Sequence, residues 1–346
     1  MRKSFASDNW AGVLPEIMAA IAAANTEIAH THAYGDDPYS IAALARFREA
    51  FGAPVEVYYV FNGTGANIVA LQSLLRPFEG IICAQKAHLD ADECGAPERI
   101  LGSKLITLPT PDGKLTPEIV QQAYTRIGDQ HASQPRVISI TQPTELGTVY
   151  SPAEIRALAD FAHARNMYLH VDGARICNAV ASLQSSFQAV ITDTEVDILS
   201  FGGTKIGLMY GEAIVVMPRL AESVRHALPY IRKQTMQLAS KMRFVAAQFA
   251  ALLSDDLWRR TALHANAMAQ RLANGAAQVP AVRINQQVQA NGIFASLPPE
   301  WVEPLQQTAE FYVWDETKDE VRWMTAWDTQ PEEVDAFLET LAKMAQ

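Results

Sequence analysis

Between residues 55 and 217 the chain repeats one alternation, in which a short run of apolar and β-branched residues is followed by a helical pattern. The stretch from Pro152 to Arg165 shows the helical part, with a proline in the first turn and apolar residues three or four positions apart. Strands that are apolar throughout and alternate with helices favour a mostly parallel sheet covered on both faces. We therefore predict an α/β fold with a seven-stranded sheet between helices, whose strands contain VYYVF (57–61), IICA (81–84), KLITL (104–108), RVISI (136–140), MYLHV (167–171), DILSF (197–201) and AIVVM (213–217).

After Pro218 the pattern changes, and longer helical segments replace the alternation. This second part is typical of a small C-terminal α+β domain, with predicted helices over 219–252 and 255–277, strands over 293–297, 311–314 and 321–325, and a last helix from Pro331. The predicted organisation is an N-terminal segment over residues 1–46, a large α/β domain over 47–250 and the small domain over 251–346.

The charge of the chain limits its partners. With 28 Lys and Arg against 38 Asp and Glu the net charge is -10, which disfavours general attraction to nucleic acid or to an anionic membrane. No stretch approaches the roughly 20 apolar residues of a membrane span. Cys83, Cys94 and Cys177 are scattered and form no CxxC pair, so we expect reduced thiols, no metal site and a cytoplasmic location.

In open parallel sheets ligands bind beyond the carboxyl ends of the strands, and three such positions carry chemistry. The first, FNGTGAN (61–67), runs from a strand through a glycine-rich turn into a helix that we expect to begin near Ala66. Free backbone N–H groups at the helix start, together with the Thr64 hydroxyl, would bind a phosphate there. The spacing matches neither a dinucleotide motif nor a P-loop, so plain turn chemistry is an equal alternative.

The other two positions are an acid and a lysine at the ends of consecutive strands. Asp172 follows MYLHV, where its ordinary interpretation is a helix cap or a partner of Arg175. Lys205 lies among glycines in SFGGTKIG (200–207), where a solvated loop lysine is the usual interpretation. Together the three positions supply what pyridoxal 5′-phosphate requires, namely a phosphate anchor, a carboxylate for the ring nitrogen and an amine for the Schiff base. A cationic ring nitrogen would explain a buried Asp172, because a paired buried charge is tolerated where an isolated one is not.

These residues resemble the fold-type I pyridoxal-phosphate enzymes, and among them the threonine aldolases of the β-eliminating lyase group. The resemblance spans nearly the whole chain, and its most specific parts are HVDGAR and the lysine motif. It implies cleavage of the Cα–Cβ bond of L-threonine, L-allo-threonine and related β-hydroxy-α-amino acids, which gives glycine and an aldehyde. The matching pieces occur in the order of that family: Ser7-Asp8-Asn9, YGDDPY (34–39), NGTGAN (62–67), AHLDAD (87–92), HVDGAR (170–175), SFGGTK (200–205) and Arg322.

The resemblance implies cofactor-binding roles for individual residues. Lys205 would carry the cofactor, Asp172 would face its ring nitrogen, and Gly63 and Thr64 would bind its phosphate. His88 would stack on the ring and is a candidate for acid–base work near the substrate hydroxyl, the alternative being an ordinary loop histidine.

The resemblance also implies a carboxylate clamp formed by Ser7, Arg175 and Arg322, with Arg175 counted among the cofactor-binding residues as well. A planar guanidinium suits this task because it donates two parallel hydrogen bonds. Ser7 would bring the N-terminal segment into the active site. Arg322 has a second interpretation as an exposed strand residue, since Val321 and Trp323 flank it.

The family is oligomeric, with sites completed by a second subunit, so the resemblance implies a homo-oligomer, either a dimer or a tetramer. Lys233 or Lys241 could then reach a neighbour's phosphate, although a solvated helix face is the more ordinary interpretation. The chain departs from the family at Thr144-Glu145-Leu146-Gly147, where many relatives carry Thr-His-Asn-Gly. The handling of the β-substituent, including discrimination between threonine and its allo diastereomer, therefore stays open.

The motifs indicate which cofactor is used more clearly than they indicate which substrate bond is broken. A β-eliminating lyase or an aminotransferase on the same fold is the alternative function, and a non-catalytic binding module is a more remote one. A binding module would not need the Schiff-base lysine, the ring partner and the carboxylate clamp together. The chain also has no appended basic segment of the kind that binds DNA.

Overall fold

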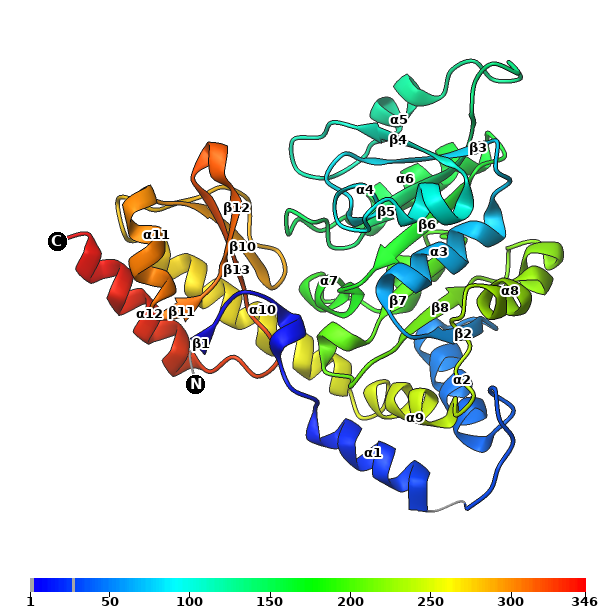
Figure 1. Ribbon diagram of the computed structural model, residues 1–346, viewed down its shortest axis with the longest axis horizontal. Coiled ribbons are helices and arrows are strands. Elements are labelled where there is room, and N and C mark those ends of the chain that lie inside the picture. The colour runs from blue at the N-terminus through cyan, green and yellow to red at the C-terminus, as the bar shows by residue number, and fades with distance from the viewer. Residues whose placement is uncertain (1–2, 27–28) are drawn as a thin grey trace.

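The computed structural model describes residues 3–26 and 29–346. The molecule has two parts, each built around its own sheet (Figure 1). All seven predicted strands of the larger part are confirmed, as β2 (Glu56–Val60), β3 (Glu79–Ala84), β4 (Lys104–Leu108), β5 (Gln134–Thr141), β6 (Tyr168–Gly173), β7 (Ile198–Gly202) and β8 (Glu212–Val216).

The seven strands form one sheet in the order β2-β8-β7-β6-β5-β3-β4. β8 runs antiparallel to its neighbours β2 and β7, and the other neighbouring strands pair in parallel. The carboxyl ends of the parallel strands therefore share one edge with the first residue of β8, Glu212, which pairs with Gly202 at the end of β7. This edge is where a ligand is expected in an open α/β sheet.

Both faces of the large sheet are buried, which is why its strands are apolar at successive positions. Along β3, Ile81 and Cys83 belong to the core on one face, and Ile82 and Ala84 belong to the core on the other. The first face is covered by α3 (Gly63–Leu74), α4 (His88–Ala91) and α8 (Glu222–Gln234). The second face is covered by α1 (Pro15–Thr26), α2 (Pro38–Phe51), α5 (Pro117–Ala123), α6 (Pro152–His163), α7 (Ile176–Ser182) and α9 (Arg243–Leu252).

The smaller part contains an antiparallel sheet in the order β12-β13-β10-β9. It also contains a two-stranded parallel pair, β1 with β11, which attaches the N-terminal strand to this part. Its core includes Trp323, Phe337 and Phe5. The bounds of its elements are β1 (Lys3–Ser4), β9 (Arg283–Ile284), β10 (Gly292–Ser296), α11 (Pro299–Gln306), β11 (Ala309–Glu310), β12 (Tyr312–Asp315), β13 (Glu320–Met324) and α12 (Pro331–Met344).

One helix joins the two parts. α10 (Leu257–Ala276) packs Trp258 and Ala262 into the core of the larger part, and Met268 and Leu272 into the core of the smaller part. The change from one core to the other thus falls inside a continuous helix, which crosses between the two sheets in Figure 1. Within the described ranges, no helix combines the length and apolar character needed to cross a bilayer.

Two predicted helices differ from the structure. The single helix predicted over 219–252 is wrong, because α8 ends at Gln234 and α9 begins at Arg243. Between them Met236 has a positive φ of 63°, which turns the chain so that Gln237 accepts a hydrogen bond from the Phe61 N–H at 3.0 Å. The helix predicted to begin near Ala66 begins earlier, at Gly63, so the glycine-rich motif forms its first turn.

Candidate active site

A cavity of about 300 Å³ opens at the carboxyl edge of the large sheet. We refer to it as the main cavity. Five residues singled out in the sequence line it together, namely Gly63, Thr64, His88, Asp172 and Lys205. Its other lining residues are Asn9, Phe61, Asn62, Asn67, Glu93, Ala174, Thr204, Tyr210 and Glu212.

The first turn of α3 forms one end of the main cavity. Asn62 is the N-cap residue, and its Oδ1 accepts a hydrogen bond from the Gly65 N–H at 2.8 Å. The N–H groups of Gly63 and Thr64 precede the first intrahelical bonds and lie at the positive end of the helix dipole. A Cβ at Gly63 would meet nothing within 4 Å, so this end has room for an anion next to the backbone.

Asp172 lies inside β6 and is only 4% exposed. Its carboxylate accepts hydrogen bonds from Asn67 Nδ2 at 2.9 Å and from the Ala174 N–H at 3.0 Å. The interpretation of Asp172 as a helix cap or as a partner of Arg175 is wrong, because α7 has no side-chain cap and Arg175 pairs with Asp8. Among the residues that the structure describes, Asp172 forms no ion pair. A buried carboxylate of this kind fits a protonated ring nitrogen of a ligand.

Lys205 lies on the short 3-10 helix η4 (Thr204–Ile206), directly after β7. It lies close to Asp172 because β6 and β7 are neighbours and the turn after Asp172 packs against the end of β7. Gly202 makes this approach possible, since a Cβ at that position would lie 2.1 Å from the Ala174 carbonyl oxygen. Within the described part of the chain the Lys205 amine has no ion-pair partner, so it is available to a ligand in the main cavity.

A second buried acid, Glu212, lies beside the lysine. Glu212 Oε2 accepts a hydrogen bond from the Gly203 N–H at 2.5 Å and so holds the turn that leads to Lys205. Burial raises the pKa of Glu212 to about 7, although hydrogen bonds from Gly203 and Thr204 and the charge of Lys205 act in the opposite direction. Sequence reasoning missed Glu212 because it stands just before the apolar run that marks β8.

His88 opens the short helix α4 and is half-buried at the wall of the main cavity. Its Nδ1 lies 3.2 Å from Glu93 Oε1. The hydrogen bond with Glu93 raises the pKa of His88, burial opposes this, and the charges of Glu145 and Asp172 add to the increase. Sequence reasoning missed Glu93. The motif AHLDAD (87–92) ends one residue before it, and the spacing between His88 and Glu93 matches no known motif.

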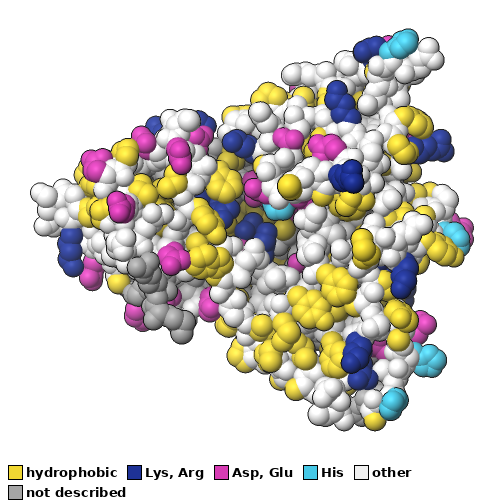
Figure 2. Space-filling model, in the orientation of Figure 1, with side chains coloured by type: hydrophobic (Ala, Val, Ile, Leu, Met, Phe, Trp, Pro, Cys, Tyr) yellow, Lys and Arg dark blue, Asp and Glu magenta, His cyan; other side chains and the backbone are white. Residues whose placement is uncertain are grey.

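The two predicted clamp arginines face a second recess between the parts of the molecule. Arg175 and Arg322 both line it, together with Glu145 and Asn291. In Figure 2, side chains of Lys or Arg gather in the hollow between the two parts. The recess therefore brings two guanidinium groups together, as the predicted carboxylate clamp requires, and the acid Glu145 lines it as well.

Arg175 is already held by an acid that sequence reasoning had not assigned a role. Its Nε and Nη2 donate to Asp8 at 2.6 and 2.9 Å, and Asp8 also accepts from Asn291 Nδ2 at 3.1 Å. Burial alone would raise the pKa of Asp8, but the charge and hydrogen bonds of Arg175, with smaller contributions from Lys205 and Asn291, hold it below its usual value.

Arg322 projects from β13 and is half-buried, so its interpretation as an exposed strand residue is wrong. Its Nη2 donates to the Ala6 carbonyl at 3.1 Å, and its guanidinium lies 4.6 Å from the centre of the Trp314 ring. Its Nε is buried and has no partner in the described part of the chain. Burial and the neighbouring Arg175 lower the pKa of Arg322. These features leave Arg322 with unused donors.

Ser7 has a local structural contact. It is the N-cap of the 3-10 helix η1 (Asp8–Trp10), and its hydroxyl accepts a hydrogen bond from the Asn9 N–H at 3.2 Å. Its neighbours on both sides face the site, since Asp8 binds Arg175 and Ala6 binds Arg322. Ser7 therefore lies beside the predicted clamp.

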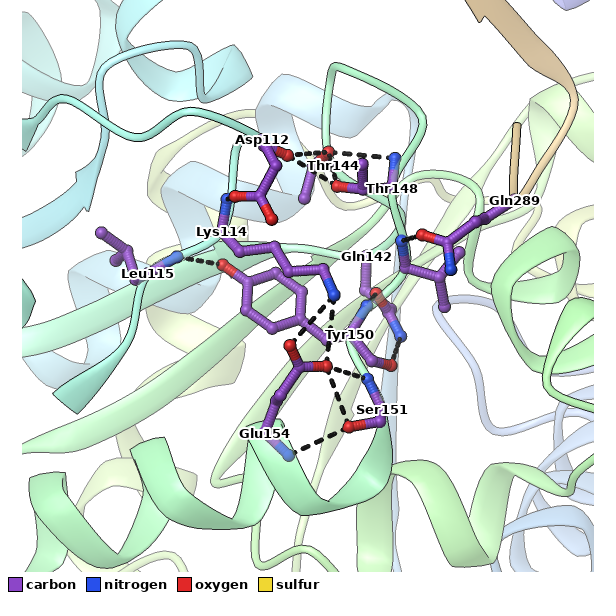
Figure 3. A network of polar contacts seen from close by, with 11 residues as sticks. Asp112, Lys114, Leu115, Gln142, Thr144, Thr148, Tyr150, Ser151, Glu154 and Gln289 are labelled. Atoms are coloured by element: carbon purple, nitrogen blue, oxygen red, sulfur yellow. Dashed lines mark hydrogen bonds and ion pairs between the residues drawn. The ribbon is translucent and has the colours of Figure 1, made fainter. Parts of the chain in front are cut away.

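The loop that departs from the family pattern is rigidly held (Figure 3). Thr144 and Thr148 bond to each other through their hydroxyls at 2.7 Å, and the Thr148 hydroxyl donates to the Asp112 carbonyl at 2.7 Å. On the other side the Val149 N–H donates to Gln289 Oε1 of the smaller part at 2.9 Å. This network fixes the loop whose tip carries Glu145 toward the recess of the two arginines.

Lys233 and Lys241 do not line the main cavity of their own chain. The Lys233 Nζ lies 5.6 Å from the centre of the Tyr34 ring. Lys241 lines a separate cavity that also contains His30 and His32. Neither lysine therefore contributes to the site within one chain.

Enzymes of fold type I that use pyridoxal 5′-phosphate need a phosphate site, an acid and a lysine around one ring, and the main cavity contains all three. This chain belongs to the fold-type I pyridoxal-phosphate enzymes. The family model for β-eliminating lyases matches residues 4–297. The chain therefore belongs to the β-eliminating lyase family.

Within this family the chain is similar to threonine aldolases. A low specificity L-threonine aldolase of Pseudomonas aeruginosa is 43% identical over 335 residues, covering 96% of this chain and 95% of its own length. A second one, from Escherichia coli K12, is 30% identical over 256 residues and covers 71% of this chain and 72% of its own.

Solved structures show the same similarity. The structure of a threonine aldolase from Leishmania major superposes with a TM-score of 0.93 at 28% identity, covering 99% of this chain and 100% of that one. An aspartate aminotransferase from Thermus thermophilus, at 16% identity and a TM-score of 0.70, covers 98% of this chain and 90% of its own, and shares the fold.

Proposed function

We propose that this protein is a pyridoxal-phosphate-dependent aldolase that cleaves L-threonine and L-allo-threonine, and related β-hydroxy-α-amino acids, to glycine and an aldehyde. The observation that carries the proposal is the meeting of Asp172, Lys205 and the start of α3 in one cavity beside two arginines. The similarity to low specificity L-threonine aldolases supports the choice of reaction. When bound, the cofactor supplies an electron-withdrawing ring that accepts the electron pair released at the substrate Cα.

In this proposal the chain's own residues bind and orient the reactants. Gly63 and Thr64 would hold the phosphate with backbone N–H groups and a hydroxyl, and the Lys205 amine would hold the cofactor through its aldehyde. Asp172 would keep the ring nitrogen protonated, because an opposite charge in a buried site favours the charged form. These roles position one reacting centre above the sheet edge.

The substrate carboxylate would bind in the recess of the two arginines. Arg322 has a buried Nε with no hydrogen-bond partner among the described residues, and Arg175 keeps donors that Asp8 does not use. Ser7 lies at the edge of this carboxylate clamp. His88 is then the group placed to accept the β-hydroxyl proton at the main cavity.

We further propose that the protein works in the cytoplasm as a homo-oligomer, a dimer or a tetramer. Large apolar side chains exposed near the helix that carries Lys233 support an interface there, since Tyr230 is 62% and Met236 81% exposed. Lys233 and Lys241 would then be available to a neighbouring subunit. Light scattering coupled to gel filtration measures the assembly, and a monomer at catalytic concentrations would reject it.

An aldehyde-release assay over L-threonine, L-allo-threonine and phenylserine tests the reaction. We expect acetaldehyde and glycine in equal amounts from the first two substrates. Pyruvate or ammonia from serine or cysteine, without aldehyde from threonine, would instead identify a β-eliminating lyase. Lys205→Ala should abolish both the cofactor absorbance of the bound form and turnover, and retained aldolase activity in this variant would reject the assignment of Lys205.

A further inference from the structure

Four buried or half-buried side chains form a continuous chain of hydrogen bonds along the wall of the main cavity. His88 Nδ1 lies 3.2 Å from Glu93 Oε1, and Asn67 Nδ2 lies 2.9 Å from both Glu93 Oε1 and Asp172 Oδ2. Glu93 is 4% and Asn67 2% exposed. The chain thus connects the histidine at the cavity wall with the acid that faces the ring nitrogen.

The orientation of the Asn67 amide follows from its neighbours. Two carboxylates approach the same side of the amide, and a carbonyl oxygen placed there would face two acceptors. The nitrogen must therefore point at them, with one of its two hydrogens donated to each carboxylate. This leaves Asn67 Oδ1 buried and without a partner in the described part of the chain, a cost that is accepted only because the other orientation is worse.

The proton between His88 and Glu93 can be placed by the same reasoning. A carboxylate oxygen has no proton to donate, so Glu93 Oε1 accepts from His88 as it does from Asn67. His88 must then carry a proton on Nδ1. In the neutral imidazole this leaves Nε2, on the other side of the ring, as the unprotonated atom with a free electron pair.

We propose that Glu93 is a positioning residue that holds the proton of His88 on Nδ1, so that Nε2 acts as the base in the cleavage, and that Asn67 fixes Glu93 by bonding both it and Asp172. This inference rests on the proposed aldolase function. Asn67 belongs to the motif NGTGAN (62–67), but neither Asn67 nor Glu93 was assigned a role from the sequence.

The step that Glu93 supports is the transfer of one proton from the substrate to His88, coupled to cleavage of the Cα–Cβ bond. Nε2 takes the proton of the substrate β-hydroxyl, and the O–H electron pair forms the carbonyl bond of the aldehyde. The Cα–Cβ bond breaks at the same time, and its electron pair stays on the Cα side until a proton completes glycine. The Glu93 carboxylate stabilises the imidazolium that forms on His88, because the hydrogen bond becomes charge-assisted on both sides.

Other charged groups also act on His88. Glu145 approaches from the loop after β5 and Asp172 from β6, and both charges raise the pKa of His88 without a hydrogen bond to it. Lys205 and Glu212 line the same cavity. Among the residues that the structure describes, Glu93 alone bonds the ring directly, so Glu93 is the residue that can select which nitrogen is protonated.

Histidine nitrogen NMR tests the proposal on the full-length protein saturated with pyridoxal phosphate, and again without added cofactor. The chain has 8 histidines, and His88→Asn identifies the signal of interest. In the wild-type protein we expect neutral His88 to carry its proton on Nδ1. A wild-type signal with the proton on Nε2 would overturn the proposal, and the tautomer is measured on the wild-type protein itself, because the variant serves only to assign the signal.

Two substitutions separate the hydrogen bond from the general effect of charge. Glu93→Gln should lower the proton affinity of His88 about tenfold, equal to one pKa unit, and should increase the fraction of the Nε2–H form. Glu145→Gln should lower the pKa of His88 as well but leave the proton of the neutral ring on Nδ1, because it only removes a distant charge. A tautomer that stays the same in Glu93→Gln, with its pKa unchanged, would contradict the role of Glu93.

Kinetics distinguish failure of this inference from failure of the proposed function. The acid limb of kcat/KM for threonine cleavage should move to lower pH in Glu93→Gln by the same amount as the NMR titration. If aldehyde is released but neither the acid limb nor the tautomer responds to Glu93→Gln, the inference fails and the function stands. If the tautomer responds and no aldehyde is released by the wild-type protein, the aldolase function fails and the Glu93–His88 pair stands as a structural feature.

Discussion

The pair of Asp8 and Arg175 gives the sharpest stability prediction. In the native protein the Asp8 side chain is 1% and the Arg175 side chain 11% exposed, and two hydrogen bonds join them. Asp8→Ala leaves the guanidinium buried without its acid and also removes a partner of Asn291. Removing one member of a buried pair costs about 3–5 kcal/mol, because the remaining charge is neither solvated nor paired.

Urea unfolding followed by circular dichroism measures this loss, and the chain offers a matched control. Arg271 and Asp335 make the same two-bond contact, at 2.7 Å each, but their side chains are 47% and 46% exposed. Asp335→Ala should therefore change the free energy of unfolding far less than Asp8→Ala. Equal losses in the two variants would refute the argument from burial.

The same pair predicts a dependence on pH. The pKa of Asp8 is lower in the folded than in the unfolded protein, where it is about 3.9. The stability that Asp8 contributes is therefore present above the unfolded value and is lost as the pH falls through the folded value. The difference in unfolding free energy between wild type and Asp8→Ala should be constant at neutral pH and should shrink in acid.

Three further predictions concern the site. Arg322→Ala should raise KM about 10- to 100-fold while the cofactor stays bound, because hydrogen bonds to a charged group are lost, and unchanged kinetics would mean that the carboxylate clamp lies elsewhere. The free energy of unfolding of Glu212→Gln, relative to that of wild type, should be larger at pH 8 than at pH 4.5. The pKa of Glu212 is raised to about 7 in the folded protein, so its contribution to stability is present below the unfolded pKa and is lost as the pH rises through the folded value. Urea unfolding at both pH values checks the sign. Gly202→Ala should weaken cofactor binding and lower stability, because the new Cβ would overlap the Ala174 carbonyl, and fluorescence titration with pyridoxal phosphate would reveal an unaffected site if this reasoning is wrong.

The sequence predicted those parts of the fold that depend on local pattern. The strands of the large sheet were readable because both faces are buried, which makes successive residues such as Ile81 and Ile82 apolar. The break between α8 and α9 was not readable, because it depends on a contact of Gln237 with the distant Phe61. Such a contact leaves no periodicity in the sequence.

The site was predictable where a residue stands in a motif. Lys205 follows β7 and Asp172 lies near the end of β6, and both stand directly after an apolar run or a glycine-rich turn that the sequence shows. Glu93, Glu212 and the pairing of Asp8 with Arg175 were not, because each depends on a partner from another element. The role of a buried acid depends on the hydrogen-bond donors around it, and these donors can be identified only in the folded structure.

The N-terminal segment that follows β1 has a consequence for ligand binding. Phe5 is anchored in the core of the smaller part, and Asp8 holds an arginine of the larger part. A movement of one part of the molecule away from the other would have to break these contacts of Phe5 and Asp8 as well as bend α10. The recess of the two arginines is thus tied to both parts of the molecule, so we expect little ordering entropy to be lost when a ligand binds there.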